Sequence, residues 1–159
     1  MPIFNFQLIA QAKTPDGKPV NVSPVVALYQ RGPVVPVSIT LEQNMAKTLL
    51  AQGKGVMGQP GIALIDTGAT NSAVDDETAR GLGIPAIDQG KMTSTTHEDQ
   101  PCSIFPIQFT VGNQLIFQVP RCAGAKLKPM GLIAIIGRDI LQNCTLIYNG
   151  GLGSITLAI

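Results

Sequence analysis

Ile62-Ala-Leu-Ile-Asp-Thr-Gly-Ala-Thr70 is a run of four apolar residues that leads directly into a carboxylate. A short apolar run of this kind predicts a buried strand, and Gly68 allows a tight turn just after it. Asp66 is therefore expected at the end of a buried strand, where an ionised side chain is costly unless it has partners. We interpret Asp66 as a functional acid. The alternative is an ordinary buried acid that caps the following turn.

Length and composition predict a folded domain. The chain has 159 residues, enough to bury its own core, and we expect a single domain over residues 1–159, with N-terminal strands in 1–32. Forty-five per cent of the residues are hydrophobic and 13% are charged, which is typical of a folded protein rather than a disordered one. Twelve prolines and seventeen glycines favour short strands and turns over long helices.

Charge and cysteine content exclude several classes of function. A net charge of +1 provides no electrostatic surface for nucleic acid or for an anionic membrane. Apolar runs such as Leu132–Ile136 are too short to span a bilayer, and Met1–Ala12 lacks the features of a signal peptide. Cys102, Cys122 and Cys144 are unclustered, so we expect reduced structural thiols, a cytoplasmic location and no metal or other cofactor.

The pattern of apolar residues predicts about nine or ten strands and two or three short helices. The expected strands are Phe4–Leu8, Val25–Tyr29, Val34–Ile39, Ile62–Ile65, Lys91–Thr95, Cys102–Val111, Gln114–Val119, Leu132–Ile136, Cys144–Tyr148 and Ser154–Ile159. Turns are expected at Thr14–Lys18 and Gly112–Asn113, and a glycine-rich loop at Gly53–Gly61.

Three polar residues are expected to cap short helices. Thr40 would cap a helix that runs to Gln52, with Gln43 reaching back to form a capping box. Asp75 would cap a helix that ends at Gly81, and Asp139 would cap a helix through Gln142.

Two motifs resemble those of one protein family. Asp66-Thr67-Gly68-Ala69 resembles the signature of aspartic proteases, and Ile135–Leu141, Ile-Ile-Gly-Arg-Asp-Ile-Leu, resembles the second signature of the retropepsins. The similarity covers about Pro33 to Ile159, while the first thirty residues and the helix near Leu41–Gln52 resemble elaborations of bacterial single-lobed retropepsin-like proteins. The resemblance implies a mainly β, closed, barrel-like retropepsin (acid protease) fold and a hydrolase of the aspartic endopeptidase type.

The resemblance also implies a homodimer. Acid hydrolysis of a peptide bond needs two carboxylates that share a proton around a water molecule. This chain has one Asp-Thr-Gly, so the second carboxylate would be Asp66 of a second copy, facing the first across a two-fold axis. The implied substrate is an extended, largely hydrophobic segment of a protein or peptide. The alternative is a dimeric binding or scaffold module of the same fold with weak or no proteolytic activity.

The resemblance implies that several residues support Asp66. Thr67 would hydrogen-bond to its twin across the axis, and Gly68 would let the substrate backbone approach. Gly137 would pack where a side chain collides with the Asp66 loop, and Arg138 would pin nearby loops. Ala69 and Asp139 complete the supporting set. Many retroviral enzymes have an acid where this chain has Thr70, which leaves the partner of Arg138 open, with Asp75 and Asp76 as candidates.

By position, Met92–Ile104 is expected to be a flap, a hairpin that closes over the substrate. Its tip residues Thr95, Thr96, His97 and Glu98 would contact the substrate. His97 is the only histidine, and the alternative for it is a solvated loop residue.

The last strand is expected to serve assembly. Ser154–Ile159 alternates apolar and polar residues at the end of the sequence and would be an unpaired edge if left alone. We expect it to pair with the same strand of a second subunit, beside the preceding Cys144–Tyr148 strand.

Overall fold

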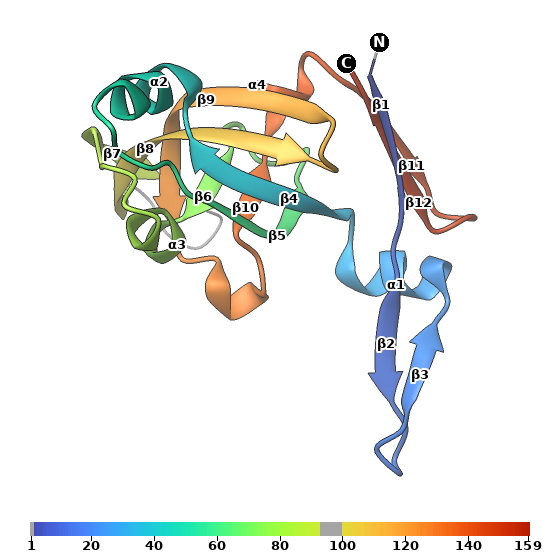
Figure 1. Ribbon diagram of the computed structural model, residues 1–159. Helices are drawn as coiled ribbons and strands as arrows, with labels where there is room; N and C mark the ends of the chain where they lie inside the picture. The colour runs from blue at the N-terminus through green and yellow to red at the C-terminus, as the bar shows by residue number, and fades with distance from the viewer. Residues whose placement is uncertain (1, 93–99) are drawn as a thin grey trace.

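The computed structural model describes residues 2–92 and 100–159, and its main body is a closed β barrel (Figure 1). Neighbouring strands around the barrel are β4 (Val34–Leu41), β5 (Gly58–Ile65), β10 (Ala134–Ile136), β6 (Ala73–Asp75), β9 (Leu115–Ala125) and β8 (Gln100–Val111). The ring closes because β4 pairs with β5 and also, through Val37–Leu41, with β8. A further strand, β7 (Asp88–Met92), pairs with the other part of β8. The expected mainly β, barrel-like fold is confirmed.

Alternating side chains fill the barrel. Along β4 every second residue is buried, beginning with Val35, as expected for a strand with one face on a core. Phe105, Ile107 and Phe109 of β8 are completely buried in the same cluster. The predicted strand Ile62–Ile65 is the end of β5, where Ala63 and Ile65 point inward. Because β5 already begins at Gly58, the expected loop over Gly53–Gly61 is too long.

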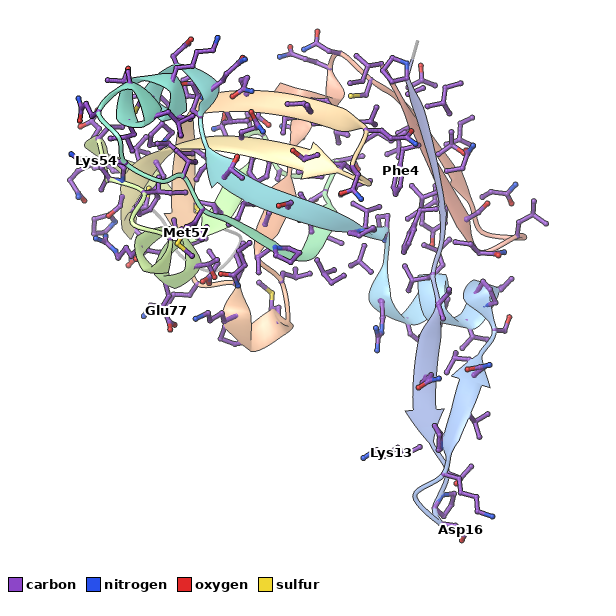
Figure 2. The ribbon with its side chains drawn as sticks, in the orientation of Figure 1. Phe4, Lys13, Asp16, Lys54, Met57 and Glu77 are labelled. Atoms are coloured by element: carbon purple, nitrogen blue, oxygen red, sulfur yellow. The ribbon has the colours of Figure 1, made fainter. Side chains whose placement is uncertain are left out.

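A second sheet stands beside the barrel (Figure 1). Its order is β1 (Ile3–Gln7), β12 (Ser154–Ala158) and β11 (Thr145–Asn149), with all neighbours antiparallel. The side chain of Phe4 points from β1 toward the barrel (Figure 2). It fills the space over Gly112, where an added Cβ would lie 2.0 Å from Phe4 Cε2. This contact fastens the small sheet to the turn between β8 and β9.

The expected pairing of Ser154–Ile159 with the same strand of a second subunit is wrong, because both sides of this strand are paired within the chain. β12 is the central strand of its sheet, because β1 of the same chain pairs with the side that β11 leaves open. Its residues Ile155 and Leu157 are fully buried. Within the described part of the chain, the outer strands of this sheet are β1 and β11.

The predicted strand Val25–Tyr29 is instead a helix, α1 (Pro24–Arg31). Its β-branched residues are typical of strands, but Pro24 occupies the first turn, where proline favours a helix. Ala27 and Leu28 are buried against the core, and the helix ends at Gly32, whose φ is 72°. Before this helix, β2 (Ala10–Lys13) and β3 (Pro19–Val22) form a hairpin with Lys13 and Asp16 near its tip (Figure 2). The predicted turn at Thr14–Lys18 joins these strands.

The predicted capping box at Thr40–Gln43 is also wrong. Thr40 belongs to β4, and the cap of α2 (Gln43–Ala51) is Glu42, whose Oε2 accepts hydrogen bonds from Asn44 N and Met45 N at 3.0 and 3.2 Å. The pairing of β4 with β8 extends as far as Leu41, so the helix starts later than its sequence signal.

The other turns and helices agree with the prediction in part. Asp75 caps α3 (Asp76–Gly81) as expected. The turn after β8 spans Gly112–Gln114, one residue longer than predicted, since Val111 pairs with Leu115. A short 3-10 helix, η1 (Lys128–Met130), follows β9. The cap of α4 (Arg138–Leu141) is Gly137 rather than Asp139. No helix of the described residues is long and apolar enough to cross a membrane.

Candidate active site

Asp66 lies directly after β5, where this strand runs parallel to β10. Its backbone N–H donates to the carbonyl of Ile136 at 2.9 Å, which extends the ladder by one residue. Its Oδ1 accepts hydrogen bonds from Gly68 N at 2.8 Å and Ala69 N at 3.3 Å. Among the described residues, Oδ2 has no hydrogen-bond partner, and the side chain is half-buried. One oxygen therefore stabilises the turn, and the other is available to a ligand.

Arg138 clamps the Asp66 loop from the start of α4. Its Nη1 donates to the carbonyls of Thr67 and Gly68 at 2.9 and 3.1 Å, and its Nη2 donates to Thr70 Oγ1 at 2.7 Å. Backbone bonds from Arg138 N to Ala69 O and from Asp139 N to Thr70 O run beside this clamp. Guanidinium groups suit such a site because their donors are held in a rigid fork.

Neither candidate partner for Arg138 is correct. Asp75 binds backbone groups elsewhere, and Asp76 pairs with Arg80 at 2.7 Å. Thr70, the residue that stands in place of the viral acid, supplies the acceptor instead. A hydroxyl can accept this hydrogen bond without adding a negative charge near Asp66.

Ser72 is a supporting residue that sequence reasoning missed. Its backbone N donates to both carboxylate oxygens of Asp139 at 2.9 Å, and its Oγ donates to Asp139 Oδ1 at 2.7 Å. The same Oγ accepts from Gly137 N at 2.9 Å. Asp139 thus anchors the segment after the Asp66 loop. A lone serine carries no sequence signal for this role, because its partners are 65 and 67 residues away.

Gly137 packs directly against this segment. A Cβ built on it would lie 2.6 Å from the carbonyl carbon of Asn71, 2.8 Å from its oxygen and 2.9 Å from Ser72 N. Backbone atoms cannot move aside as a flexible side chain would. The position therefore requires glycine for close approach rather than for a special dihedral, since its φ of −94° is ordinary.

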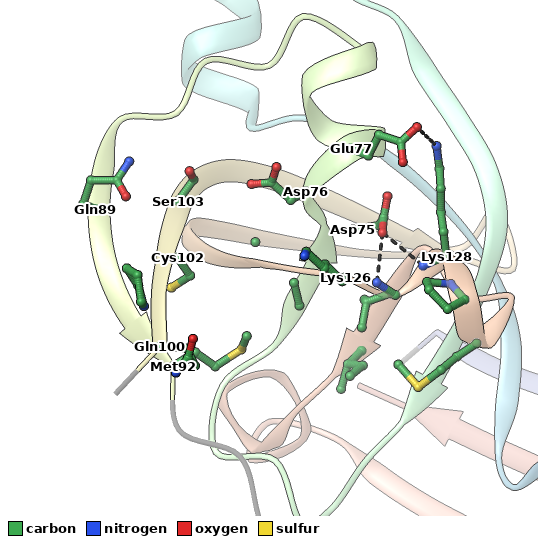
Figure 3. A pocket seen from close by; sticks show the side chains of 17 residues that line it. Asp75, Asp76, Glu77, Gln89, Met92, Gln100, Cys102, Ser103, Lys126 and Lys128 are labelled. Carbon is green, nitrogen blue, oxygen red and sulfur yellow. Dashed lines mark hydrogen bonds and ion pairs between the residues drawn. The ribbon is translucent and has the colours of Figure 1, made fainter. Parts of the chain in front are cut away.

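A groove with a volume of about 1210 Å³ lies on the side of the barrel where α3 begins (Figure 3). It runs between the start of α3, the ends of β7 and β8 and the segment from Gly124 to Met130, and its lining includes Ile135. Asp66 is not part of the lining. The two are connected through β10, because Ile135 precedes the residue whose carbonyl binds Asp66 N.

The expected flap lies partly outside the described residues. Met92 at the end of β7 and Gln100 at the start of β8 line the groove and pair with each other. Thr95, Thr96, His97 and Glu98 fall in the segment 93–99, outside the part of the chain that the structure describes.

The three cysteines are free thiols, and Cys102 and Cys122 are buried. Burial, with a smaller contribution from the charge of Asp139, raises the pKa of the Cys122 thiol well above its ordinary value. Such a thiol stays protonated and is a poor nucleophile. Within residues 2–92 and 100–159, no three His, Cys, Asp or Glu side chains gather to hold a metal ion.

Comparison with known proteins identifies the family of the chain. A family model described as aspartyl protease matches residues 55–139, which is more than half of the chain. None of the curated proteins matches. Among solved structures, the crystal structure of a retropepsin-like aspartic protease from Rickettsia conorii is similar with 14% identity and a TM-score of 0.45, over 99% of this chain and 94% of that chain. Because the family match contains both the Asp66 turn and the Gly137–Asp139 segment that holds it, the chain belongs to the aspartyl protease family.

Proposed function

We propose that the protein is an aspartic endopeptidase whose active site forms between two copies of the chain, each contributing Asp66. The observation that carries this proposal is the Asp66 carboxylate itself. It is held by one oxygen through two backbone N–H groups, and its other oxygen has no partner in the described part of the chain. A carboxylate presented in this way can bind a water molecule.

The second carboxylate is proposed to come from a second copy because the nearby acids serve other contacts. Asp139 binds Ser72, Asp75 binds the backbone of Leu127 and Lys128, and Asp76 pairs with Arg80. Two carboxylates that face each other closely cannot both ionise easily, so the pair retains one proton. The ionised member would take a proton from water, while the protonated member would donate one to the scissile carbonyl.

The supporting residues have a clear part in this chemistry. General acid–base catalysis depends on placing the carboxylate accurately, and the Asp66 loop is fixed from two directions. Arg138 holds the carbonyls of Thr67 and Gly68, and Ser72 ties the following segment to Asp139. Thr67 is exposed, which is compatible with the proposed contact to its twin in a dimer.

The proposed substrate is an extended, largely hydrophobic protein segment. The groove offers apolar side chains for alternate residues of such a segment, including Met92, Met130 and Ile135. Free cysteines support a reducing, cytoplasmic setting.

Cleavage of a mixed peptide library at several pH values tests the activity. The parent protein should cut between hydrophobic residues, and Asp66→Asn should abolish cleavage while the fold persists. Asp16→Asn is the matched control, because Asp16 lies on the hairpin near Lys13, away from the barrel (Figure 2). Equal cleavage by Asp66→Asn and the parent contradicts the proposal. Peptide binding without cleavage by the parent would favour the binding or scaffold module instead.

Dilution tests the homodimer. If each site needs two chains, specific activity should fall as the protein is diluted below the dissociation constant of the dimer. Sedimentation velocity measured over the same concentrations should show dimers converting to monomers in parallel. A monomer that keeps full activity at every concentration refutes the shared dyad.

A further inference from the structure

Asp75 is a buried acid outside the Asp66 site, and its two oxygens bind different parts of the chain; Figure 3 shows its bonds to the segment that contains Lys128. Asp75 is the last residue of β6, and only 2% of its surface is exposed. Oδ1 accepts from the N–H and the hydroxyl of Thr78, at 2.9 and 2.8 Å, and so caps α3. Oδ2 accepts from Leu127 N at 2.9 Å and Lys128 N at 3.1 Å.

The two oxygens thus join two parts of the groove that are far apart in sequence. The first residues of α3 form one side of the groove. The segment Lys126–Met130, which we call the groove wall, forms another side. The parallel pairing of β6 with β9 ends at Asp75 and Ala125, immediately before the wall begins. Beyond Ala125, hydrogen bonds to the Asp75 carboxylate, rather than strand pairing, connect the end of β6 to the groove wall.

The other connection between α3 and the wall is weaker. Lys128 Nζ lies 2.7 Å from Glu77 Oε1, but their side chains are 47% and 77% exposed. Exposed ion pairs contribute little to stability, because water screens them and the long side chains lose freedom. Hydrogen bonds from backbone N–H groups to a buried carboxylate are stronger and more directional. Of these two connections between α3 and the wall, the hydrogen bonds to Asp75 are therefore the stronger one.

The Asp75 side chain stays ionised in the folded protein, because its pKa is lowered. Burial by itself would raise the pKa of Asp75, but hydrogen bonds from Thr78, Leu127 and Lys128 outweigh it and hold the pKa below the ordinary value. At neutral pH the side chain is ionised and accepts from all of its donors.

We propose that Asp75 is a positioning residue for substrate: its Oδ2 holds the wall at Leu127 and Lys128 so that the groove keeps its shape. That substrate occupies the groove rests on the proposed function. Asp75 touches neither the reacting atoms nor Asp66, so its loss should weaken binding of a long peptide without changing the chemical step.

The test variant is Asp75→Ser. Serine also caps helices well, but its side chain has a single oxygen and is too short for that oxygen to reach the groove wall. The matched control is Thr78→Val, which removes one donor on the capping side and leaves Oδ2 with its two partners. Two quantities are measured for each: amide hydrogen exchange at Leu127 and Lys128, and kcat and KM for a peptide long enough to fill the groove and for a shortened one.

In Asp75→Ser, exchange at Leu127 and Lys128 should accelerate by roughly tenfold to a hundredfold, the factor for losing a buried hydrogen-bond partner. KM should rise for the long peptide only, while kcat stays close to that of the parent. Thr78→Val should show neither change. Unchanged exchange in Asp75→Ser overturns the proposal, and so does an equal loss of activity on both peptides.

Asp75→Asn is a second variant in case Asp75→Ser does not fold. Its amide has one acceptor oxygen, so protection must decrease either at Thr78 or at Leu127 and Lys128, and protection retained at all three contradicts the assigned contacts. If the parent cleaves no peptide, the proposed function fails, and the exchange measurement still decides whether Asp75 holds the wall.

Discussion

Gly137→Ala is expected to destabilise the protein and to slow catalysis. The new Cβ would lie 2.6 Å from the carbonyl carbon of Asn71, about 0.8 Å closer than the 3.4 Å at which ordinary van der Waals contact begins. Alanine tolerates the φ of −94° at this position, so the whole cost is steric. The segment after the Asp66 loop, at Asn71 and Ser72, must move or α4 must withdraw.

The expected loss of stability follows from the steric overlap of the new Cβ with the backbone of Asn71 and Ser72. Overpacking a tight contact costs about 1–3 kcal/mol, which for a chain of this size lowers Tm by roughly 2–4 °C per kcal/mol. We therefore expect a fall of about 4–8 °C for a cost near 2 kcal/mol. Displacing the Asp66 carboxylate by a similar distance can reduce the cleavage rate by up to about a hundredfold.

Thermal unfolding and peptide cleavage are measured on Gly137→Ala beside Gly81→Ala as the control. Nothing lies within 4 Å of a Cβ at Gly81, and its φ is not positive. Alanine at Gly81 should be neutral or stabilising by up to about 1 kcal/mol. If Gly137→Ala melts and cleaves like the parent, the close packing of Gly137 against the segment after the Asp66 loop is not what positions the carboxylate.

Three further outcomes are expected. Ser72→Ala leaves the buried N–H of Gly137 without an acceptor, so urea unfolding should show a loss of about 1–3 kcal/mol. Arg138→Lys replaces a fork that reaches three acceptors with a single ammonium group; kcat should fall, and an unchanged kcat would refute the clamp. Asp75 has a lowered pKa in the folded protein. Its contribution to the free energy of unfolding is therefore complete at pH values above the ordinary pKa of Asp, about 3.9, and is lost as the pH falls through the folded pKa. The difference in unfolding free energy between the parent and Asp75→Asn should therefore shrink in acid, and a constant difference would contradict the shift.

Local sequence signals predicted a large part of this structure. The apolar run before Asp66, the cap at Asp75 and the turn at Thr14–Lys18 each depend on residues that are close together in the chain. The two signatures also led to the expected barrel, because both occur at the ends of its strands.

In two of the wrong predictions, a contact with distant residues overrides the local sequence pattern. The β-branched residues of Val25–Tyr29 favour a strand, but burial of Ala27 and Leu28 makes a helix the stable choice. Thr40 has the sequence of a helix cap, yet pairing with β8 keeps it in β4.

The sequence by itself determined the acid, the turn around it and the family of folds, because those features arise from neighbouring residues. Only the tertiary structure decided which groups hold that acid in place. Thr70 binds Arg138 across 68 residues, Ser72 binds Asp139 across 67, and β1 covers β12 from the opposite end of the chain. The physical reason is that a hydrogen bond depends on distance and direction in space, which the closed barrel creates and which local sequence patterns do not encode.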